Sequence, residues 1–124
     1  MVRCRGFTLL EMMLVLAVLA ILLTLAWPRY VSHVDRGKET VLRENLRTVR
    51  DAIDRFYDDS GRYPDNIEEL VQRRYLRSMP IDPLTERADL WIVIPPLAGE
   101  KGMLRDLRSG ATGRTLDGVG YSEL

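Results

Sequence analysis

Residues 7 to 27 read FTLLEMMLVLAVLAILLTLAW, and the organisation of the chain follows from this stretch. Its only ionisable side chain is that of Glu11. About 20 helical residues at roughly 1.5 Å each cross a hydrocarbon core of about 30 Å, so the stretch predicts one membrane-spanning helix. Because Arg3 and Arg5 precede it, the positive-inside rule places the N-terminus in the cytoplasm and the residues after Trp27 on the far side of the membrane.

A cleaved secretory signal peptide is the alternative interpretation of this stretch, since Thr24-Leu25-Ala26 offers small residues for a cut. Three features argue against it. The apolar run exceeds the usual length of roughly 7 to 15 residues, it carries a carboxylate near its start, and the helical pattern continues past the cut. A membrane anchor that stays in the protein is therefore the favoured interpretation.

The remaining composition limits the function classes. The chain has 124 residues, 18 basic and 18 acidic side chains, and one cysteine. This length allows one domain with an appendage, and zero net charge argues against a nucleic-acid partner. His33 is the only histidine, and no serine has a second histidine to activate it. The sequence therefore gives no support for an enzyme.

Glu11 is the most informative residue of the apolar stretch. A carboxylate inside hydrocarbon costs about 2.5 to 3.5 kcal/mol, so it needs a partner or a proton. A cut between Gly6 and Phe7 would create an ammonium group at Phe7, and in a staggered parallel bundle this group could meet Glu11 of a neighbouring copy. A protonated Glu11, or one that reaches the membrane interface, is the alternative.

The same residues resemble a known targeting signal. Residues 5 to 11, RGFTLLE, with the apolar run and Pro28-Arg29-Tyr30 after it, are similar to the class III signal of type IV prepilins and type II secretion pseudopilins. The resemblance implies that a prepilin peptidase cuts after Gly6 and methylates the amine of Phe7. It also implies that Glu11 pairs with the N-terminus of a neighbour during assembly.

Beyond the membrane the helix is expected to continue to about Asp58, with a kink near Pro28 and a stop at Ser60-Gly61. One apolar stripe of this helix recurs at helical spacing and comprises Leu42, Leu46, Val49, Ile53 and Phe56. Two acid-before-base pairs at i, i+4 are typical of a solvated helix face, namely Glu39-Arg43 and Asp51-Arg55.

The rest of the chain predicts a short helix and short strands. Asp65 is expected to cap a helix through Val71, with Glu68 completing a capping box. Strands are expected at 90–94 and 103–107, with a third near 119–122. The predicted fold is therefore α+β, a long N-terminal helix on a small antiparallel sheet, and the resemblance implies that it is pilin-like. Its parts are a leader at 1–6, a transmembrane and assembly helix at 7–27, and a periplasmic head at 28–124.

A second resemblance lies in the head. Gly61-Arg62-Tyr63-Pro64, Tyr75-Leu76, Pro80 and Asp82-Pro83 are similar to the layout of the G-type major pseudopilin of type II secretion systems. The resemblance implies a structural subunit that polymerises into the periplasmic pseudopilus. Implied partners are other copies of the chain, prepilin peptidase, minor pseudopilins and the inner-membrane secretion platform. A type IV pilin, a DNA-uptake pseudopilin and a membrane-anchored periplasmic binding module stay open as alternatives.

The cysteine count bears on how the C-terminal loop is held. Type IV pilins usually close this loop with a disulfide, but the only cysteine here is Cys4, in the leader. The resemblance to major pseudopilins implies a calcium ion instead, and Asp106 and Asp117 are the carboxylates expected to contribute. Aspartates that only turn the chain or face water are the alternative.

Overall fold

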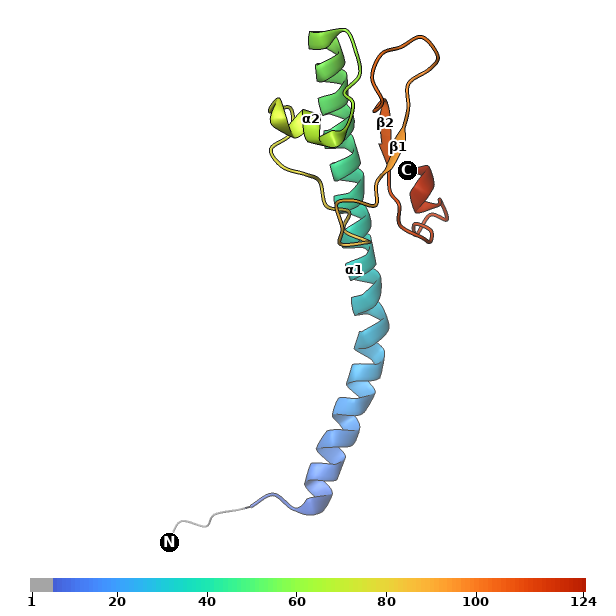
Figure 1. Ribbon diagram of the computed structural model, residues 1–124. Helices are drawn as coiled ribbons and strands as arrows, with labels where there is room; N and C mark the ends of the chain where they lie inside the picture. Colours follow the sequence, from blue (N-terminus) through green and yellow to red (C-terminus); the bar gives the residue numbers. More distant parts are fainter. Residues whose placement is uncertain (1–5) are drawn as a thin grey trace. The chain divides into compact units, whose positions relative to one another are not determined.

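The computed structural model describes residues 6–124, and it begins with a single long helix (Figure 1). Its elements in chain order are α1 (Leu9–Ser60), α2 (Ile67–Gln72), β1 (Ile92–Ile94), β2 (Asp106–Arg108) and the 3-10 helix η1 (Tyr121–Glu123). The chain divides into two compact units, Met1–Asp35 and Arg36–Leu124. The fold is α+β and pilin-like, as predicted. Of the predicted leader, Gly6 alone lies within the described residues, and Cys4 lies outside them.

The first unit consists mainly of the apolar part of α1. The helix begins after Thr8, whose Oγ1 accepts a hydrogen bond from the backbone N–H of Glu11 at 3.2 Å. Pro28 lies inside the helix, where it has no N–H to donate to the carbonyl of Thr24. The hydroxyl of Thr24 donates to the carbonyl of Ile21 at 2.7 Å. By length and composition this helix can cross a membrane, and the side chains of its apolar window are exposed.

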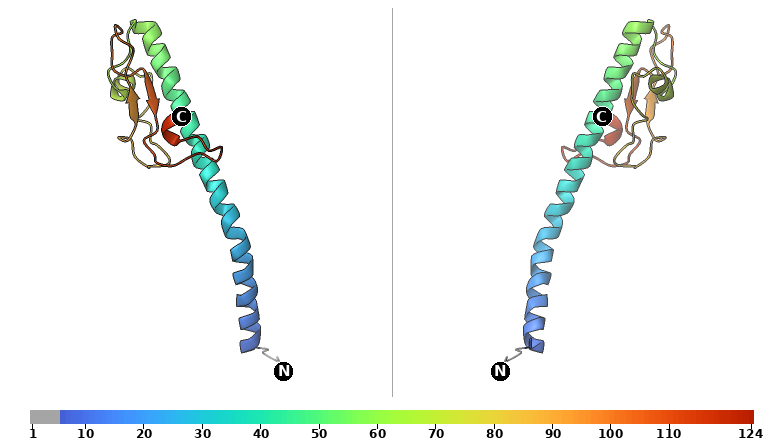
Figure 2. Two further views of the ribbon diagram at one scale, coloured as in Figure 1. Left: turned by 90° about the vertical axis from the view of Figure 1, so that its right-hand side faces the viewer. Right: turned by 90° about the vertical axis from the view of Figure 1, so that its left-hand side faces the viewer.

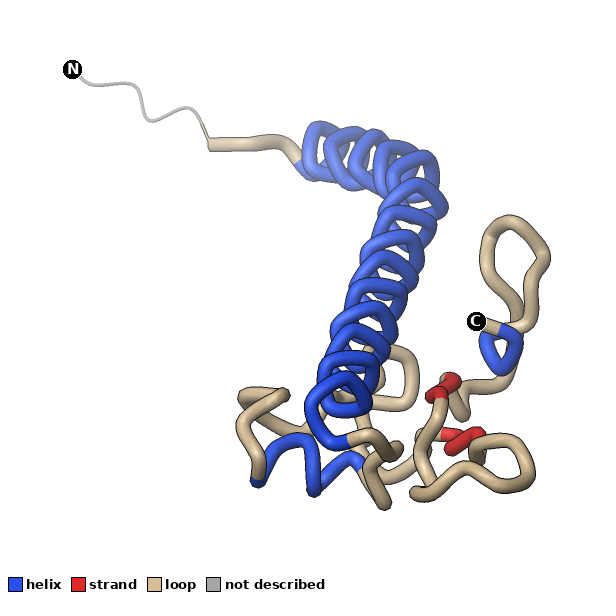
Figure 3. The backbone as a smooth tube through the Cα atoms, turned by 90° about the horizontal axis from the view of Figure 1, so that it is seen from above, coloured by secondary structure: helices blue, strands red, loops and turns tan. Residues whose placement is uncertain are grey.

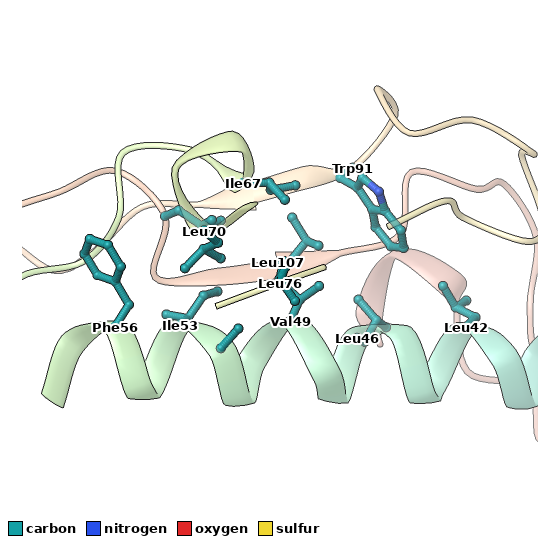
Figure 4. Packing of buried hydrophobic residues seen from close by; sticks show 12 residues of the cluster. Leu42, Leu46, Val49, Ile53, Phe56, Ile67, Leu70, Leu76, Trp91 and Leu107 are labelled. Atoms are coloured by element: carbon teal, nitrogen blue, oxygen red, sulfur yellow. The ribbon is translucent and has the colours of Figure 1, made fainter. Parts of the chain in front are cut away.

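The second unit is built on the C-terminal part of α1. The apolar stripe predicted at helical spacing is confirmed, because each of its side chains is at most 1% exposed. Figure 4 shows Leu42, Leu46, Val49, Ile53 and Phe56 on one side of the helix, facing residues of α2, β2 and the loops between. Burying a side chain of this size contributes about 1.5 to 3 kcal/mol. The stripe therefore forms half of the head's core.

The other half of the core comes from elements that lie on the same side of α1 in both views of Figure 2. It comprises Ile67, Leu70, Leu76, Trp91, Leu104 and Leu107. Trp91 is 9% exposed, and its indole N–H donates to the carbonyl of Pro80 at 2.9 Å. Trp91 is thus a core residue.

Helix α2 begins one residue later than predicted. The capping residue is Asn66, whose side chain accepts the N–H of Glu69 at 2.8 Å. Glu69, and not Glu68, reaches back over the helix start, where its Oε2 accepts the N–H of Asp65 at 2.9 Å. The prediction that Asp65 caps the helix is wrong. Asp and Asn are both good capping residues, and Asn66 is the one that directly precedes the buried Ile67.

The sheet has two antiparallel strands, drawn in red in Figure 3, with Val93 opposite Leu107. β2 begins at Asp106 and not at Met103, because the N–H groups of Met103 and Leu104 donate to the carbonyl of Pro64. The third predicted strand is wrong. Residues 121–123 form η1, and near it one isolated bridge joins Arg114 to Gly120.

Candidate assembly site

The predicted processing and assembly residues lie at the start of the described chain. Gly6 and Phe7 precede α1, and Phe7 is 75% exposed. Glu11 is in the first helical turn, where a negative charge interacts favourably with the helix dipole. Cleavage at Gly6, methylation of Phe7 and pairing of Glu11 each involve a second molecule, so these roles stay predictions.

Thr8 is a residue that the sequence analysis did not single out. Thr8 and Glu11 stand at the spacing of a capping box, T-x-x-E, and that pattern could have identified the start of the helix. The hydroxyl of Thr8 satisfies the N–H of Glu11, one of the backbone donors that a helix start leaves without an intrahelical partner. Thr8 therefore fixes the turn that carries Glu11.

Large apolar side chains cover the first unit all round. Leu9, Leu10, Leu14, Leu23 and Trp27 are each more than 60% exposed, and the large apolar residues between them are at least 40% exposed. Soluble proteins rarely leave a contiguous apolar surface of this extent uncovered. This surface therefore needs lipid or other protein around it.

The two aspartates predicted to bind calcium occupy different surroundings. Asp106 lies at the start of β2. Its Oδ1 accepts hydrogen bonds from Arg50 Nε at 2.7 Å and from the backbone N–H of Leu107 at 2.7 Å. Asp117 is 80% exposed as a side chain and lies 3.9 Å from Arg43. Within residues 6–124, no three His, Cys, Asp or Glu side chains gather closely enough to hold a metal ion.

This donor set does not fit a calcium ion. Calcium takes six to eight oxygen ligands, and the guanidinium group of Arg50 already contacts one carboxylate oxygen of Asp106. Each aspartate instead faces a different arginine of α1.

A charged cluster closes the C-terminal end of α1. Glu69 Oε1 accepts a hydrogen bond from Arg62 at 2.6 Å and forms an ion pair with Arg73 Nε at 3.3 Å. The guanidinium carbons of Arg62 and Arg73 lie 5.1 and 5.3 Å from the centroid of the Phe56 ring. The hydrogen bond from Arg62 holds the pKa of Glu69 below its ordinary value. The cluster attaches α2 to α1 and covers the buried ring.

A hydrogen bond between Tyr75 and Asp59 adds to the same end of the head. The Tyr75 hydroxyl donates to Asp59 Oδ2 at 2.6 Å, which raises the pKa of Tyr75. The Tyr75 ring meets Phe56 edge to face, with centroids 5.3 Å apart. These contacts join the end of α1 to the segment after α2.

The described residues contain no arrangement of a nucleophile with an activating base. His33 is exposed on α1, and no hydrogen bond to a serine is recorded for it among residues 6–124. Ser109 does contact a carboxylate, that of Asp82, but both residues are fully buried and no substrate can reach them.

Comparison with known proteins agrees with this geometry. Residues 1–27 match the model of the prokaryotic N-terminal methylation motif. The type II secretion system core protein G of Klebsiella michiganensis is 28% identical over 88% of this chain and 84% of its own length. The core protein G of Pseudomonas aeruginosa is 32% identical over 63% of this chain. The type IV major pilin protein PilA of Myxococcus xanthus is 35% identical over 55% of it.

Coverage differs among these relatives. The matches span 31% of the Myxococcus protein and 66% of the Pseudomonas protein, which is less than two thirds of each. No solved structure matches the chain. The methylation motif and the repeated similarity to core protein G and to type IV pilins nevertheless agree with the long apolar helix and the small α+β head. The chain carries the N-terminal methylation motif of prepilin-like proteins, and it is similar to the core protein G of type II secretion systems and to type IV pilins.

Proposed function

We propose that the chain is a structural subunit that polymerises into the periplasmic pseudopilus of a type II secretion system. The observation that carries this proposal is the similarity to a core protein G over 88% of the chain, head included, together with the methylation motif over residues 1–27. A motif alone would indicate any prepilin-like protein. The similarity of the head favours the secretion pseudopilin among them.

The proposed location is the bacterial inner membrane. Residues 7–27 of the chain would cross it once, with the N-terminus in the cytoplasm and residues 28–124 in the periplasm. The exposed apolar surface of α1 and its capacity to span a bilayer support this. Arg3 and Arg5 on the N-terminal side give the orientation.

Assembly would begin with a charge pair inside the membrane. Prepilin peptidase removes residues 1–6 and methylates the amine of Phe7, which keeps its positive charge. That amine engages Glu11 of a subunit already in the fibre, and the pair offsets the cost of a carboxylate in hydrocarbon. The apolar helices then pack together, so that protein covers the side chains that lipid covered before.

The chain would act without catalysing a reaction. Its proposed partners are other copies of itself, prepilin peptidase, the minor pseudopilins and the inner-membrane platform of the secretion machine. The growing fibre would move folded substrates outward. Stable attachment of head to helix, and not a substrate pocket, is what this role requires of the second unit.

A type IV pilin is the second candidate, and the similarity to the Myxococcus major pilin over 55% of the chain supports it. A deletion strain distinguishes the two. Loss of protein secretion, with fibres and DNA uptake unchanged, is the expected result for the pseudopilin. Loss of surface fibres or of transformation, with secretion intact, would assign the chain to the second candidate or to a DNA-uptake system.

Mass spectrometry of the mature N-terminus tests the whole class. Protein extracted from membranes should begin at N-methylated Phe7. A chain that begins at Trp27 would identify a cleaved signal peptide and contradict the filament proposal. An uncleaved chain would instead support a simple membrane-anchored binding module.

Gly6→Asp tests the processing step. We expect an unprocessed precursor that stays in the membrane, because Gly6 would occupy the position next to the cut and the variant puts a charged side chain there. Gly37→Asp is the matched control, since Gly37 is exposed far along α1 and its replacement leaves the cut site intact. Normal cleavage of the Gly6 variant would contradict the assignment of the peptidase.

Glu11→Ala tests the charge pair. The variant is more apolar and should insert normally, yet it should assemble poorly because a neighbour's amine has no partner. Met13→Ala, on the same helix, is the control for loss of side-chain volume. Crosslinking of subunits in the membrane measures assembly, and unimpaired filaments of Glu11→Ala would refute the charge-pair mechanism.

A further inference from the structure

The segment that follows β2 has little regular structure of its own. It contains one isolated bridge and η1, and yet Ser109, Ala111 and Thr115 in it are at most 9% exposed. A chain of this kind keeps one conformation only when something outside it holds it in place, because ordering each residue costs roughly 1 to 2 kcal/mol of conformational entropy. Besides the buried Ser109–Asp82 hydrogen bond and the packing of Tyr121 and Leu124 on the core, contacts with charged side chains of α1 hold it.

Arg50 contacts β2, which leads into this segment, and Leu124 at its other end. Its Nε donates to Asp106 Oδ1 at 2.7 Å. Its second terminal nitrogen donates to the carbonyl of Leu107, at 3.1 Å, and to the backbone oxygen of Leu124. One guanidinium group on α1 therefore joins the beginning and the end of residues 106–124, which is what a disulfide would do for such a loop.

A second contact holds the middle of the segment. Glu39 is 8% exposed, and its Oε1 accepts Arg43 at 2.9 Å. Its other oxygen, Oε2, accepts the N–H of Leu116 at 3.2 Å, while Arg43 lies 3.9 Å from Asp117. The hydrogen bond from Arg43 and that from Leu116 hold the pKa of Glu39 below its ordinary value. The carboxylate is thus ready to accept both donors at neutral pH.

These contacts place positive charge where the resemblance implied a cation. Arg50 and Arg43 face the two aspartates that were expected to bind calcium. A divalent ion at either carboxylate would be repelled by the guanidinium already there, and it would have to displace the hydrogen bonds that close the loop. A disulfide cannot serve either, since the chain has one cysteine.

We infer that Arg50, together with the Glu39–Arg43 pair, fixes the C-terminal segment to α1 in place of a calcium ion or a disulfide. The head of this chain therefore folds without calcium and depends on Arg50. The inference concerns how the head is held together. It is independent of whether the fibre belongs to a secretion system or is a pilus.

The test compares the full chain in detergent, with calcium and with chelator, in the wild type and three variants. Arg50→Met removes the charge and keeps the length of the side chain, and Arg50→Lys keeps the charge and loses the planar fork. Arg47→Met is the matched control, because Arg47 is exposed three residues earlier on α1 and makes no ion pair with the described residues. Thermal unfolding and amide hydrogen exchange are measured for each.

We expect the wild type to have the same Tm in 1 mM calcium chloride and in chelator. Arg50→Met should lower the Tm by roughly 4 to 8 °C and should speed exchange in residues 112–124 by about tenfold, with residues 42–53 of α1 unchanged. The Tm and the exchange rate of Arg50→Lys should lie between those of the wild type and of Arg50→Met. Both quantities should be the same in Arg47→Met as in the wild type. Local exchange keeps the test informative even where Arg50→Met lowers the stability of the whole head.

Two results would overturn the inference. A rise of the wild-type Tm in calcium of more than about 2 °C would identify a bound cation by ligand linkage, whatever the variants do. Exchange in residues 112–124 that is the same in Arg50→Met as in Arg47→Met would show that Arg50 does not hold the segment.

Discussion

The hydroxyl of Ser109 donates a hydrogen bond to Oδ2 of Asp82, and both side chains are fully buried. The other oxygen of Asp82 accepts the N–H groups of Leu84 and Thr85, at 2.8 and 3.4 Å. The oxygen of Ser109 accepts the N–H of Ala111 at 3.1 Å. One buried pair therefore joins the turn at residues 82–85 to the segment that follows β2.

Ser109→Ala should lower the free energy of unfolding by about 1 to 3 kcal/mol, because it leaves one oxygen of a buried carboxylate without its donor. Urea denaturation of the full chain in detergent measures this. Ser122→Ala is the control, since Ser122 is exposed in η1. Equal stability of the two variants would show that the buried pair contributes nothing.

A pair of glycine substitutions should change stability in opposite directions. A Cβ atom at Gly110 would lie 1.8 Å from the carbonyl oxygen of Leu90, so Gly110→Ala must push two backbone segments apart. A Cβ atom at Gly37 meets nothing within 4 Å, and Gly37 lies inside α1. We expect Gly110→Ala to destabilise the head by more than about 2 kcal/mol.

Gly37→Ala should stabilise the protein by about 0.5 to 1 kcal/mol, because alanine is the better helix former and loses less backbone entropy. Thermal unfolding of both variants beside the wild type gives the comparison. A stable Gly110→Ala variant would mean that the approach of residues 90 and 110 is looser than the structure describes.

Acid should weaken the cluster at the end of α1. The hydrogen bond from Arg62 lowers the pKa of Glu69 from its ordinary value of 4.5, with the N–H of Asp65 and the charge of Arg73 acting in the same direction. A lowered folded-state pKa gives stability that is present above pH 4.5 and is lost as the pH falls through the folded-state value.

Glu69→Gln should therefore be less stable than the wild type at pH 7, and the difference should shrink as the pH falls below 4.5. Glu68→Gln is the matched control, because Glu68 is the exposed neighbour on the same helix. Unfolding curves between pH 3 and pH 7 measure the effect. A difference that is constant over this range would exclude Glu69 as the titrating group.

Thr8 should matter for assembly through the turn that it caps. Thr8→Val keeps the shape of the side chain and removes the oxygen that accepts the N–H of Glu11, so the first turn of α1 should fray and assembly should fall. Thr8→Ser keeps the cap and should assemble normally. Crosslinking of subunits in membranes reports the difference, and equal assembly of the two variants would contradict this role.

The long helix and its core face could be predicted because both depend on local periodicity. Leu42, Leu46, Val49, Ile53 and Phe56 repeat at helical spacing, and all five are buried. The residues of the prepilin signal could be proposed for a similar reason, since Gly6, Phe7 and Glu11 lie close together in sequence.

The sequence did not reveal contacts between distant residues. Glu39 was expected on a solvated face beside Arg43, and that ion pair does form, but the C-terminal segment covers Glu39 and donates the N–H of Leu116 to it. For the other pair, Asp51 and Arg55, no ion pair is recorded among the described residues. Acid–base spacing on a helix cannot tell which pair a later loop will bury.

The short elements also differ from their predicted bounds because of contacts between residues that are distant in sequence. The N–H groups of Met103 and Leu104 donate to Pro64, nearly forty positions earlier, and this contact delays β2 to Asp106. In place of the predicted third strand, residues 121–123 form η1, and a single bridge joins Arg114 to Gly120. The calcium prediction came from a resemblance to a family. Nothing in the sequence indicated that Arg50 and Arg43 of α1 would lie beside Asp106 and Asp117.

The two tryptophans of the chain divide between the two units, and this makes the protein a reporter of its own state. Trp27 is 71% exposed in the first unit, and Trp91 is 9% exposed in the second. In a Trp27→Phe protein the indole fluorescence arises from Trp91 alone and follows unfolding of the head. In a Trp91→Phe protein it arises from Trp27, whose emission depends on whether lipid, water or a neighbouring helix surrounds it. The same chain, without any attached dye, can thus separate loss of the head from movement of the anchor.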